Sequence, residues 1–347
     1  DPVTGESKGL LIEEARTNLM TNSETFDNWN HNHVSVSANA TIAPDGTLSA
    51  DKVYKNNATN QAYVNRTMSA ATGDLTFTFY VKSAEYDTLG FTLFNPTDGH
   101  VANGSANLTN GTTNPSAGTI GIEDIGNGWW RIRGSGTATA SNSIMYIYPK
   151  DSTSYQGDGY SGIYVWGAQL EAGSFPTSYI PTSGSTVTRA GDDAKITGTN
   201  FSDWYSQGEG TSYVEASSFG IVTGETNRFL CFNDGSTSER TSLLIENNNN
   251  LKIYSADNSV AQTSISSGVS ATNNTVFKVA GAYKPNDFAI SANGNSAVTD
   301  TSGTLPVVTE VQIGRELTQH YLDGHIRKIA FYPKRLPNAT LQAMTEE

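Results

Sequence analysis

The sequence predicts an all-β protein made of two antiparallel β-sandwich (jelly-roll) domains and a short C-terminal helix. Three observations predict this class. Short stretches with strand periodicity recur at roughly 8–15 residue spacing with turn residues between them. Ser, Thr and Asn are abundant, with 33 Gly, and these residues favour turns and half-exposed strands. The 347 residues also exceed the roughly 250–300 that a single core serves.

The first half of the sequence contains a series of expected strands. In residues 75–82, Phe77, Phe79 and Val81 alternate with Thr76, Thr78 and Lys82, which is the period-2 pattern of a strand with one face on a core. The same pattern predicts strands over the following ranges: 89–94, 129–133, 144–148 and 160–166.

The second half repeats the pattern. Strands are expected over residues 211–216, 228–232, 242–246, 251–254, 276–283, 288–292, 311–313 and 324–332. The four Asn at 247–250 and the pair Asn293-Gly294 predict hairpin turns. A helix is expected over 337–347 with Asn338 as its cap, and a short helical turn over 200–205.

A seam divides the two predicted domains. Residues 181–195 are small, polar and punctuated by Pro and Gly, which is typical of a linker or of a strap lying on a surface. We therefore expect a jelly roll over 1–180 and a second sandwich over 196–347.

Charge and composition exclude several classes of function. A net charge of −13 disfavours nucleic-acid binding, which depends on clustered Lys and Arg. No run of 18 apolar residues is present, so no membrane insertion is expected. Cys231, the single cysteine, is interpreted as a small buried hydrophobe. The sequence begins at Asp1 without a charged and apolar leader, so no signal peptide is expected in it.

Signatures of catalysis and of metal binding are weak. No Gly-x-Ser-x-Gly, phosphate loop or His-Glu-x-x-His motif occurs, and the adjacent carboxylates Glu123 and Asp124 point to opposite faces of a strand. The sequence thus predicts no enzyme, with a polysaccharide lyase or glycosidase as the alternative. No cofactor is expected; calcium is the alternative, with five scattered candidate ligands: Glu24, Asp27, Asp51, Asp234 and Asp323.

Aromatic residues concentrate on a few of the expected strands. Tyr146 and Tyr148 share one face of their strand, and Tyr164 and Trp166 share one face of another. Trp129 is expected on the outer face of its strand. Flat rings with a polar rim suit the apolar faces of sugars, so these five residues are the predicted ligand-binding set. The alternative is that the rings fill a core, and a Trp129 buried under a loop is equally acceptable.

Three stretches together resemble a module of tailed-bacteriophage virion and tail-fibre proteins. They are 1–19, which includes Ala15-Arg16-Thr17-Asn18-Leu19; 128–131, Gly-Trp-Trp-Arg; and 166–182, Trp-Gly-Ala-Gln-Leu-Glu-Ala-Gly running into Pro-Thr-Ser-Tyr-Ile-Pro-Thr. The resemblance covers roughly residues 1–190. It implies a jelly roll like a carbohydrate-binding module, displayed outside a virion.

The second half resembles a laminin-G or concanavalin-A-like sandwich. The resemblance is based on four stretches: residues 277–283, 287–294, 311–314 and 322–332. The Glu-x-Asp-x-x-Glu strand of hydrolytic relatives is absent, which fits the expectation that no reaction is catalysed.

Together these features predict a lectin-like, non-enzymatic protein of a phage tail or virion surface that binds bacterial cell-surface polysaccharide for host adhesion. Other virion proteins are expected as partners, with a homotrimer as the expected oligomer and an extracellular location. Two alternatives remain open: a purely structural decoration of the virion, and an accessory part of a polysaccharide depolymerase.

Overall fold

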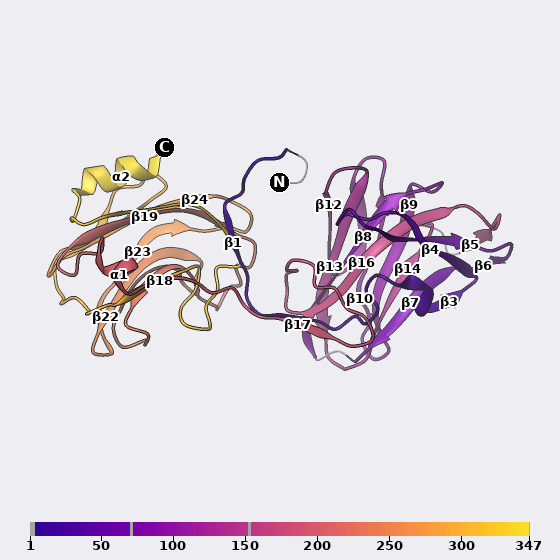
Figure 1. Cartoon of the computed structure of the whole chain (residues 1–347), viewed down its shortest axis with the longest axis horizontal. Coiled ribbons are helices and arrows are strands. Elements are labelled where there is room, and N and C mark those ends of the chain that lie inside the picture. The colour runs from indigo at the N-terminus through magenta and orange to yellow at the C-terminus, as the bar shows by residue number, and fades with distance from the viewer. Residues whose placement is uncertain (1–3, 70–71, 152–153, 347) are drawn as a thin grey trace. The chain divides into compact units, whose positions relative to one another are not determined.

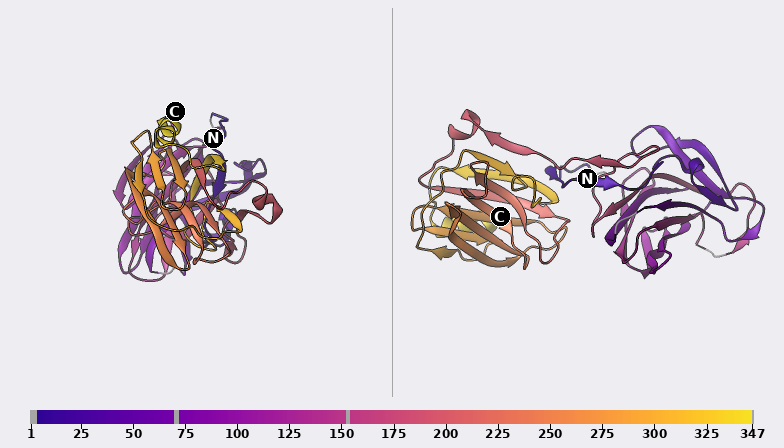
Figure 2. Two further views of the ribbon diagram at one scale, coloured as in Figure 1. Left: turned by 90° about the vertical axis from the view of Figure 1, so that its left-hand side faces the viewer. Right: turned by 90° about the horizontal axis from the view of Figure 1, so that it is seen from below.

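The computed structural model describes residues 4–69, 72–151 and 154–346. The chain forms two compact units. The N-terminal unit contains Arg16–Arg189, and the C-terminal unit contains Ser7–Ala15 together with residues 190–346. Each unit is a sandwich of antiparallel sheets (Figures 1 and 2), so the predicted all-β class with two sandwiches is confirmed.

The N-terminal unit has two six-stranded sheets. Sheet I contains, in spatial order, β11 (Thr112–Ala117), β10 (Gly99–Asn107), β9 (Thr88–Asn95), β14 (Ser143–Tyr148), β7 (Tyr63–Met68) and β3 (Asn30–Asn32). Sheet II contains β12 (Thr119–Asp124), β13 (Trp129–Ala138), β8 (Gly73–Ser83), β16 (Gly162–Ala172), β5 (Leu48–Lys55) and β4 (Val34–Ile42). Two small pairs and one 3₁₀ turn complete the unit: β15 (Tyr155–Gln156) with β6 (Thr59–Asn60), β17 (Val187–Arg189) with β2 (Arg16–Asn18), and η1 (Phe26–Asn28).

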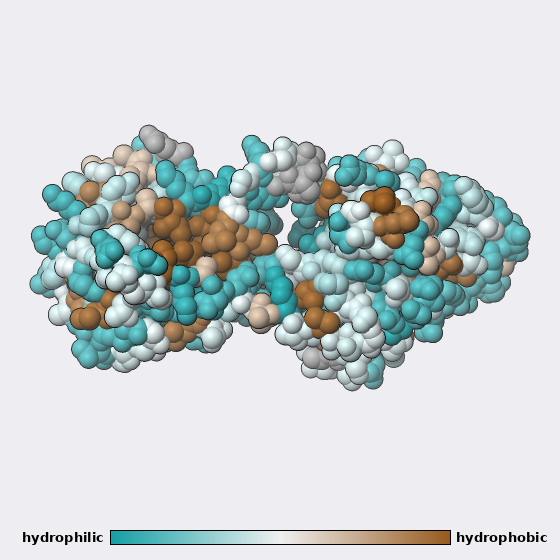
Figure 3. All heavy atoms as spheres, viewed as in Figure 1, coloured by the Kyte–Doolittle hydropathy of each residue, from teal (hydrophilic) through white to brown (hydrophobic). Residues whose placement is uncertain are grey.

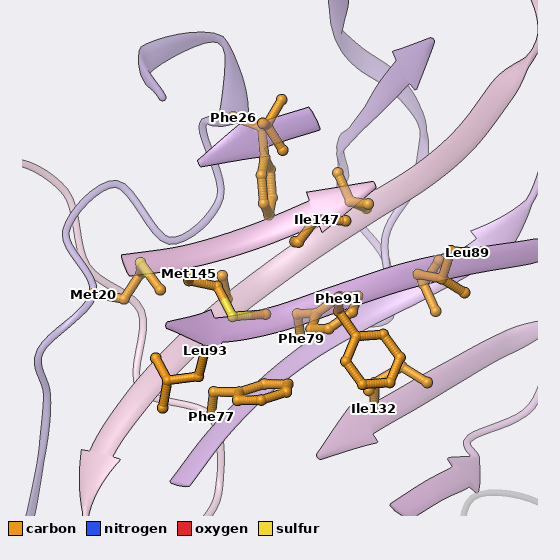
Figure 4. Close-up of a cluster of buried hydrophobic side chains, with 14 of the residues drawn as sticks. Met20, Phe26, Phe77, Phe79, Leu89, Phe91, Leu93, Ile132, Met145 and Ile147 are labelled. Carbon is orange, nitrogen blue, oxygen red and sulfur yellow. The ribbon is translucent and has the colours of Figure 1, made fainter. Parts of the chain in front are cut away.

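The core of the N-terminal unit lies between sheets I and II. Phe77 and Phe79 from β8 meet Phe91 from β9 edge to face, with ring centres 5.8–5.9 Å apart (Figure 4). Met145 and Ile147 from β14 join the same cluster. Successive residues of a strand face opposite sides, so burying these side chains turns their neighbours outward. The alternation predicted for residues 75–82 is confirmed.

The C-terminal unit also has two six-stranded sheets. Sheet III contains β1 (Leu10–Ile12), β28 (Gly324–Tyr332), β19 (Gly210–Ser218), β24 (Phe277–Tyr283), β25 (Phe288–Ala292) and β26 (Val298–Asp300). Sheet IV contains β18 (Ala194–Thr197), β27 (Glu310–Ile313), β20 (Asn227–Asn233), β21 (Arg240–Ile245), β22 (Asn250–Asp257) and β23 (Val260–Ser270). Their facing sides enclose a second core that includes Phe229, Phe277 and Phe288.

Strand β1 differs from the expected division of the chain. It pairs with β28, with Leu10 opposite Ile326 and Ile12 opposite Gly324. Residues 7–15 therefore belong to the C-terminal unit, although the sequence interpretation placed 1–180 in one domain. The reason is non-local, because the partner strand lies more than 300 residues away. The largest hydrophobic patch in the view of Figure 3 covers the part of this unit where β1 lies.

The expected linker over 181–195 is also partly structured. Val187–Arg189 form β17, which pairs with β2 in the N-terminal unit, and Ala194 begins β18 in the C-terminal unit. These strands have only three and four residues, too few for a period-2 alternation to identify them in the sequence.

Two helices accompany the C-terminal unit: α1 (Thr199–Ser202) and α2 (Asn338–Glu346). Helix α2 lies on the outer face of sheet III (Figure 1), where Leu341 packs against Ala280 and Ala282 of β24. Small alanine side chains allow the close approach of the helix to the sheet. The predicted C-terminal helix is confirmed as far as residue 346, since Glu347 lies outside the described residues. Among the described residues, neither helix has the length and apolar composition to cross a membrane.

Candidate functional site

The outer face of sheet I carries the most distinctive combination of side chains. On β14, Met145 and Ile147 are buried in the core, so Tyr146 and Tyr148 point outward. On the neighbouring β7, Tyr63 occupies the same face beside them. Two of the five residues predicted from the sequence are therefore brought together here.

The three tyrosines form a compact group. The rings of Tyr146 and Tyr148 are stacked, with centres 6.1 Å apart and an interplanar angle of 13°. Tyr63 meets both edge to face, at 5.0 Å from Tyr146 and 5.6 Å from Tyr148. Edge-to-face contacts of this kind are favourable and hold the rings in place. The result is a half-buried aromatic platform along β14.

A groove of about 370 Å³ adjoins this platform and crosses β9 and β10. Gly90 is one of the lining residues and is paired with Tyr148 on the neighbouring strand. Because glycine has no side chain, it leaves open space beside the tyrosine ring. The lining side chains are mostly polar and neutral. They are Gln61, Thr92, His100, Asn103, Ser105, Asn114 and Ser116, with Lys150 and Asp151 at one part of the wall.

Hydrogen bonds order part of that polar lining. Thr92 donates its hydroxyl to the side-chain oxygen of Asn103, and the Asn103 amide donates to the Ser116 hydroxyl at 2.6 Å. Ser116 in turn donates to the Asn103 carbonyl at 3.2 Å. The hydroxyl and amide groups therefore lie in a fixed row beside the aromatic platform.

The tyrosine hydroxyls keep their protons at neutral pH. Burial, together with the neighbouring Tyr146 and Tyr63, raises the pKa of Tyr148 to about 12. Burial likewise raises the pKa of Tyr146. Both phenols are thus available as hydrogen-bond donors as well as acceptors.

Lys150 lies in the wall of the groove, but its ammonium group contacts two aromatic rings outside the groove. Its ammonium lies 5.0 Å from the centre of the Tyr86 ring and 5.1 Å from that of Tyr155. A cation over aromatic faces is held by their quadrupoles. The platform and the hydrogen-bonded row are therefore the neutral part of the groove.

The other three predicted residues lie on the opposite side of the sandwich, on the outer face of sheet II. Trp129 and Trp166 are 3% and 4% exposed, and they cluster with Tyr164, Tyr80 and Tyr179. The indole of Trp129 donates to the Ile42 carbonyl at 3.2 Å, and that of Trp166 to the Ser49 hydroxyl at 3.0 Å. Both rings are therefore covered: Trp166 does not offer the exposed surface expected of a binding residue, and Trp129 is buried, as the stated alternative allowed.

Trp166 is covered by the segment 174–183, which we call the strap, since the Tyr179 ring lies 4.6 Å from the Trp166 ring. Two side chains of β16 hold it: Glu171 accepts the backbone N–H of Thr177 at 3.1 Å and its hydroxyl at 2.5 Å, and Gln169 accepts the N–H of Ile180 at 2.7 Å. Arg131 also donates to the Thr177 carbonyl at 2.6 Å. The strap therefore shields Trp166 from solvent, whereas Trp129 belongs to the same cluster as Ala43 and Ala50 and bonds to Ile42.

The strap also brings together the sequence stretches on which the family resemblance is based. Asn18 donates to the Ile180 carbonyl at 2.8 Å and accepts the N–H of Leu170 at 3.1 Å. The Ala-Arg-Thr-Asn-Leu, Trp-Gly-Ala-Gln-Leu-Glu and Pro-Thr-Ser-Tyr-Ile-Pro-Thr strings thus interlock around one strap. The opening residues 1–3 of the resemblance lie outside the described residues.

The calcium candidates do not come together. Asp51 accepts backbone N–H groups from Phe26 and Asn39, Glu24 accepts the Tyr179 hydroxyl, and Asp234 caps Ser236. Asp323 accepts the N–H of Glu14 at 2.8 Å, and Asp27 is exposed on η1. In the described parts of the chain, no group of three or more His, Cys, Asp or Glu side chains is placed to hold a metal ion.

Sequence reasoning missed most of the groove. Tyr63, Thr92, His100 and Asn103 were not predicted as site residues, although residues 63–68 and 99–107 are strands. The alternation of Tyr63 and Asn65 with Val64 is a local signal that would have found β7. The pairing of β10 with β9 has no such signal, because Gly and Asn break its pattern.

Similarity to known proteins is limited and is confined to solved structures. No protein-family description and no curated protein matches the sequence. Among solved structures, the chain is similar to the CBM40 of Ruminococcus gnavus IT-sialidase, with 15% identity, a TM-score of 0.36, and coverage of 41% of this chain and 85% of that one. It is similar to a SAP-like pentraxin from Limulus polyphemus, with 14% identity, a TM-score of 0.31, and coverage of 39% and 68%. The LG1-3 region of the laminin alpha2 chain matches over 80% of this chain and 66% of that one, with 12% identity and a TM-score of 0.31.

Proposed function

We propose that the N-terminal unit binds carbohydrate in the groove on sheet I and catalyses no reaction of the bound carbohydrate. One observation carries the proposal: the stacked rings of Tyr146 and Tyr148 lie beside the hydrogen-bonded row of Thr92, Asn103 and Ser116. Aromatic faces suit the apolar faces of sugar rings, and neutral hydroxyl and amide groups suit sugar hydroxyls. Tyr146 and Tyr148 follow one another along β14, which favours a chain-like ligand lying along that strand.

The biological setting follows from the sequence resemblance. We propose that the ligand is a bacterial cell-surface polysaccharide and that the chain belongs to the tail or surface of a bacteriophage particle, where it serves host adhesion. A single shallow site binds weakly, whereas a multimer displays several sites and gains avidity by a factor of about 10²–10⁴ where geometry permits. The homotrimer and the contacts with other virion proteins stay predictions.

The test is binding of purified polysaccharides, first on a glycan array and then by calorimetry with the best ligand. Tyr146→Ala and Tyr148→Ala each remove one ring of the platform, and each is expected to weaken binding by about tenfold, or roughly 1.4 kcal/mol. Tyr332→Ala is the matched control, since Tyr332 is an exposed tyrosine on β28 in the other unit. Circular dichroism checks that each variant is folded.

Two results would overturn the proposal. One is the absence of binding to any saccharide on the array, and the other is unchanged affinity in both tyrosine variants. Either result favours the alternative that the chain is a structural module of the particle. Release of reducing ends or of unsaturated products from the bound polysaccharide would instead show catalysis.

A further inference from the structure

The outer face of sheet IV contains a second hollow, in the C-terminal unit. It has a volume of about 310 Å³ and lies over β20, β21 and β22. Its walls include Arg228, Arg240, Lys252 and Glu246, with Leu244 and Tyr254 between them. We call this hollow the arginine pocket.

Arg228 is buried in the wall of the pocket, with only 6% of the residue exposed. Its Nη2 lies 3.1 Å from the Oε2 of Glu316, which is itself buried. The other two nitrogens, Nε and Nη1, have no hydrogen-bond partner among the residues that the structure describes. Leaving charged donors buried and unsatisfied is costly, so these groups indicate a partner that the chain does not itself provide.

Arg240 shares the same carboxylate. Its Nε lies 3.3 Å from the Oε1 of Glu316, and its guanidinium carbon lies 5.0 Å above the ring of Tyr254. One carboxylate therefore serves two arginines. Arg240 and Tyr254 both line the pocket, so this cation–π contact helps to hold the Arg240 guanidinium there.

The remaining charged groups of the pocket balance each other. Lys252 and Glu246 form an ion pair with 2.7 Å between Nζ and Oε2. Burial and the positive charge of Arg228 hold the pKa of His320 below its ordinary value, so this neighbour of Glu316 adds no charge at neutral pH. Three cations face two carboxylates, which leaves one positive charge in excess on a chain whose net charge is −13.

We propose that the arginine pocket binds a carboxylate group, presented by an acidic saccharide or a small organic acid. Guanidinium groups match carboxylates in geometry and bind them through paired N–H donors. The excess positive charge supplies the attraction, and Leu244 with Tyr254 offers apolar surface to the rest of the ligand. The proposal is independent of the groove on sheet I, because its residues belong to the other unit.

The experiment compares three probes by calorimetry and by NMR chemical-shift changes: sodium glucuronate, glucose and sodium acetate. Glucuronate is expected to bind and to lose affinity as salt is raised, since the attraction is electrostatic. Glucose, which lacks the charge, is expected not to bind. Acetate distinguishes a small organic acid from an acidic saccharide as the source of the carboxylate. If acetate binds as tightly as glucuronate, the pocket recognises the carboxylate alone. If acetate binds more weakly, the sugar ring contributes to the affinity.

The variants locate the binding. Arg240→Gln is expected to weaken glucuronate binding at least about tenfold, which is about 1.4 kcal/mol. Lys252→Gln should weaken it less, because Lys252 is already paired with Glu246, and it keeps the test valid if Arg240→Gln folds poorly. Arg327→Gln is the control, because Arg327 lies on β28 in sheet III. Failure of glucuronate to bind, equal binding of glucose, or full affinity in both pocket variants would overturn the proposal.

Discussion

The rings of Tyr146 and Tyr148 lie 6.1 Å apart and 13° from parallel on the outer face of β14. Their separation follows from the strand itself, because residues two apart are displaced by about 6.6 Å along it and point to the same side. Tyr63 then fixes both rings from the next strand. The platform is therefore set by backbone geometry, and a ligand lying along β14 contacts both rings.

The first prediction concerns Gly90, which lies opposite Tyr148 on β9. A Cβ there would lie 3.4 Å from the tyrosine ring, an ordinary contact, so Gly90→Ala should fold and bind as the wild type. Gly90→Leu extends further into the groove, and we expect it to weaken polysaccharide binding by about tenfold or more. Calorimetry with the array-selected glycan measures both, and thermal unfolding checks stability. A folded Gly90→Leu variant of full affinity would contradict the placement of the ligand.

Local patterns in the sequence were sufficient for part of this description. The period-2 alternation over 75–82 and 144–148 predicted both strands and the faces of their side chains, because that information lies within each strand. Trp166 and Tyr148 looked alike in sequence, yet they belong to opposite faces of the sandwich. Which face is covered depends on the strap and its bonds to Gln169 and Glu171, and the alternation within a strand does not show which of its faces a later segment covers.

The second prediction concerns the strap. Glu171 is fully buried and accepts both the N–H and the hydroxyl of Thr177. Glu171→Ala leaves those donors unsatisfied, and we expect it to lower the free energy of unfolding of the N-terminal unit by about 2 kcal/mol. Tryptophan emission should shift to longer wavelength as Trp166, which lies against Tyr179 of the strap, gains solvent. Chemical denaturation followed by fluorescence measures both effects.

Two further variants serve as comparisons for Glu171→Ala. Glu171→Gln retains one acceptor and should fall between the wild type and Glu171→Ala. Glu123→Ala removes an exposed carboxylate from β12 and should leave stability and emission unchanged. If Glu171→Ala matches Glu123→Ala, the strap is not held as described.

The third prediction concerns β1. Ile12 is buried in the C-terminal core and packs on Gly314, where a Cβ would lie 2.6 Å from the isoleucine side chain. Ile12→Ala should destabilise the C-terminal unit by about 2–4 kcal/mol. Leu10→Ala, at a side chain that is 48% exposed, should change stability little. Hydrogen exchange is the measurement: faster exchange in β28 with unchanged exchange in β8 is expected, and the reverse would assign β1 to the other unit.

The fourth prediction concerns pH. Burial, as the main cause, lowers the pKa of both His320 and His325 from the ordinary value of 6.5. The unfolded chain therefore binds protons more readily than the folded one, so stability is retained above pH 6.5 and is lost as pH falls toward the lowered values. Urea unfolding of the C-terminal unit at pH 7.5 and 5.5 should show this loss. Replacing both with Asn, which tolerates the left-handed backbone of His320, should reduce the difference; an unchanged difference would assign it to other groups.

The fifth prediction concerns Cys231, the single thiol of the chain. It lies in the C-terminal unit with no exposed surface, the Ser242 hydroxyl lies 3.2 Å from its sulfur, and burial raises its pKa. Because the thiolate is the reactive form, Cys231 should not react with a thiol reagent until the unit opens. Its labelling rate then reports the opening of the C-terminal unit by itself. We expect Ile12→Ala to speed labelling and Glu171→Ala, which acts in the N-terminal unit, to leave it unchanged. Rapid labelling of the wild-type protein in native buffer would show that Cys231 is accessible after all.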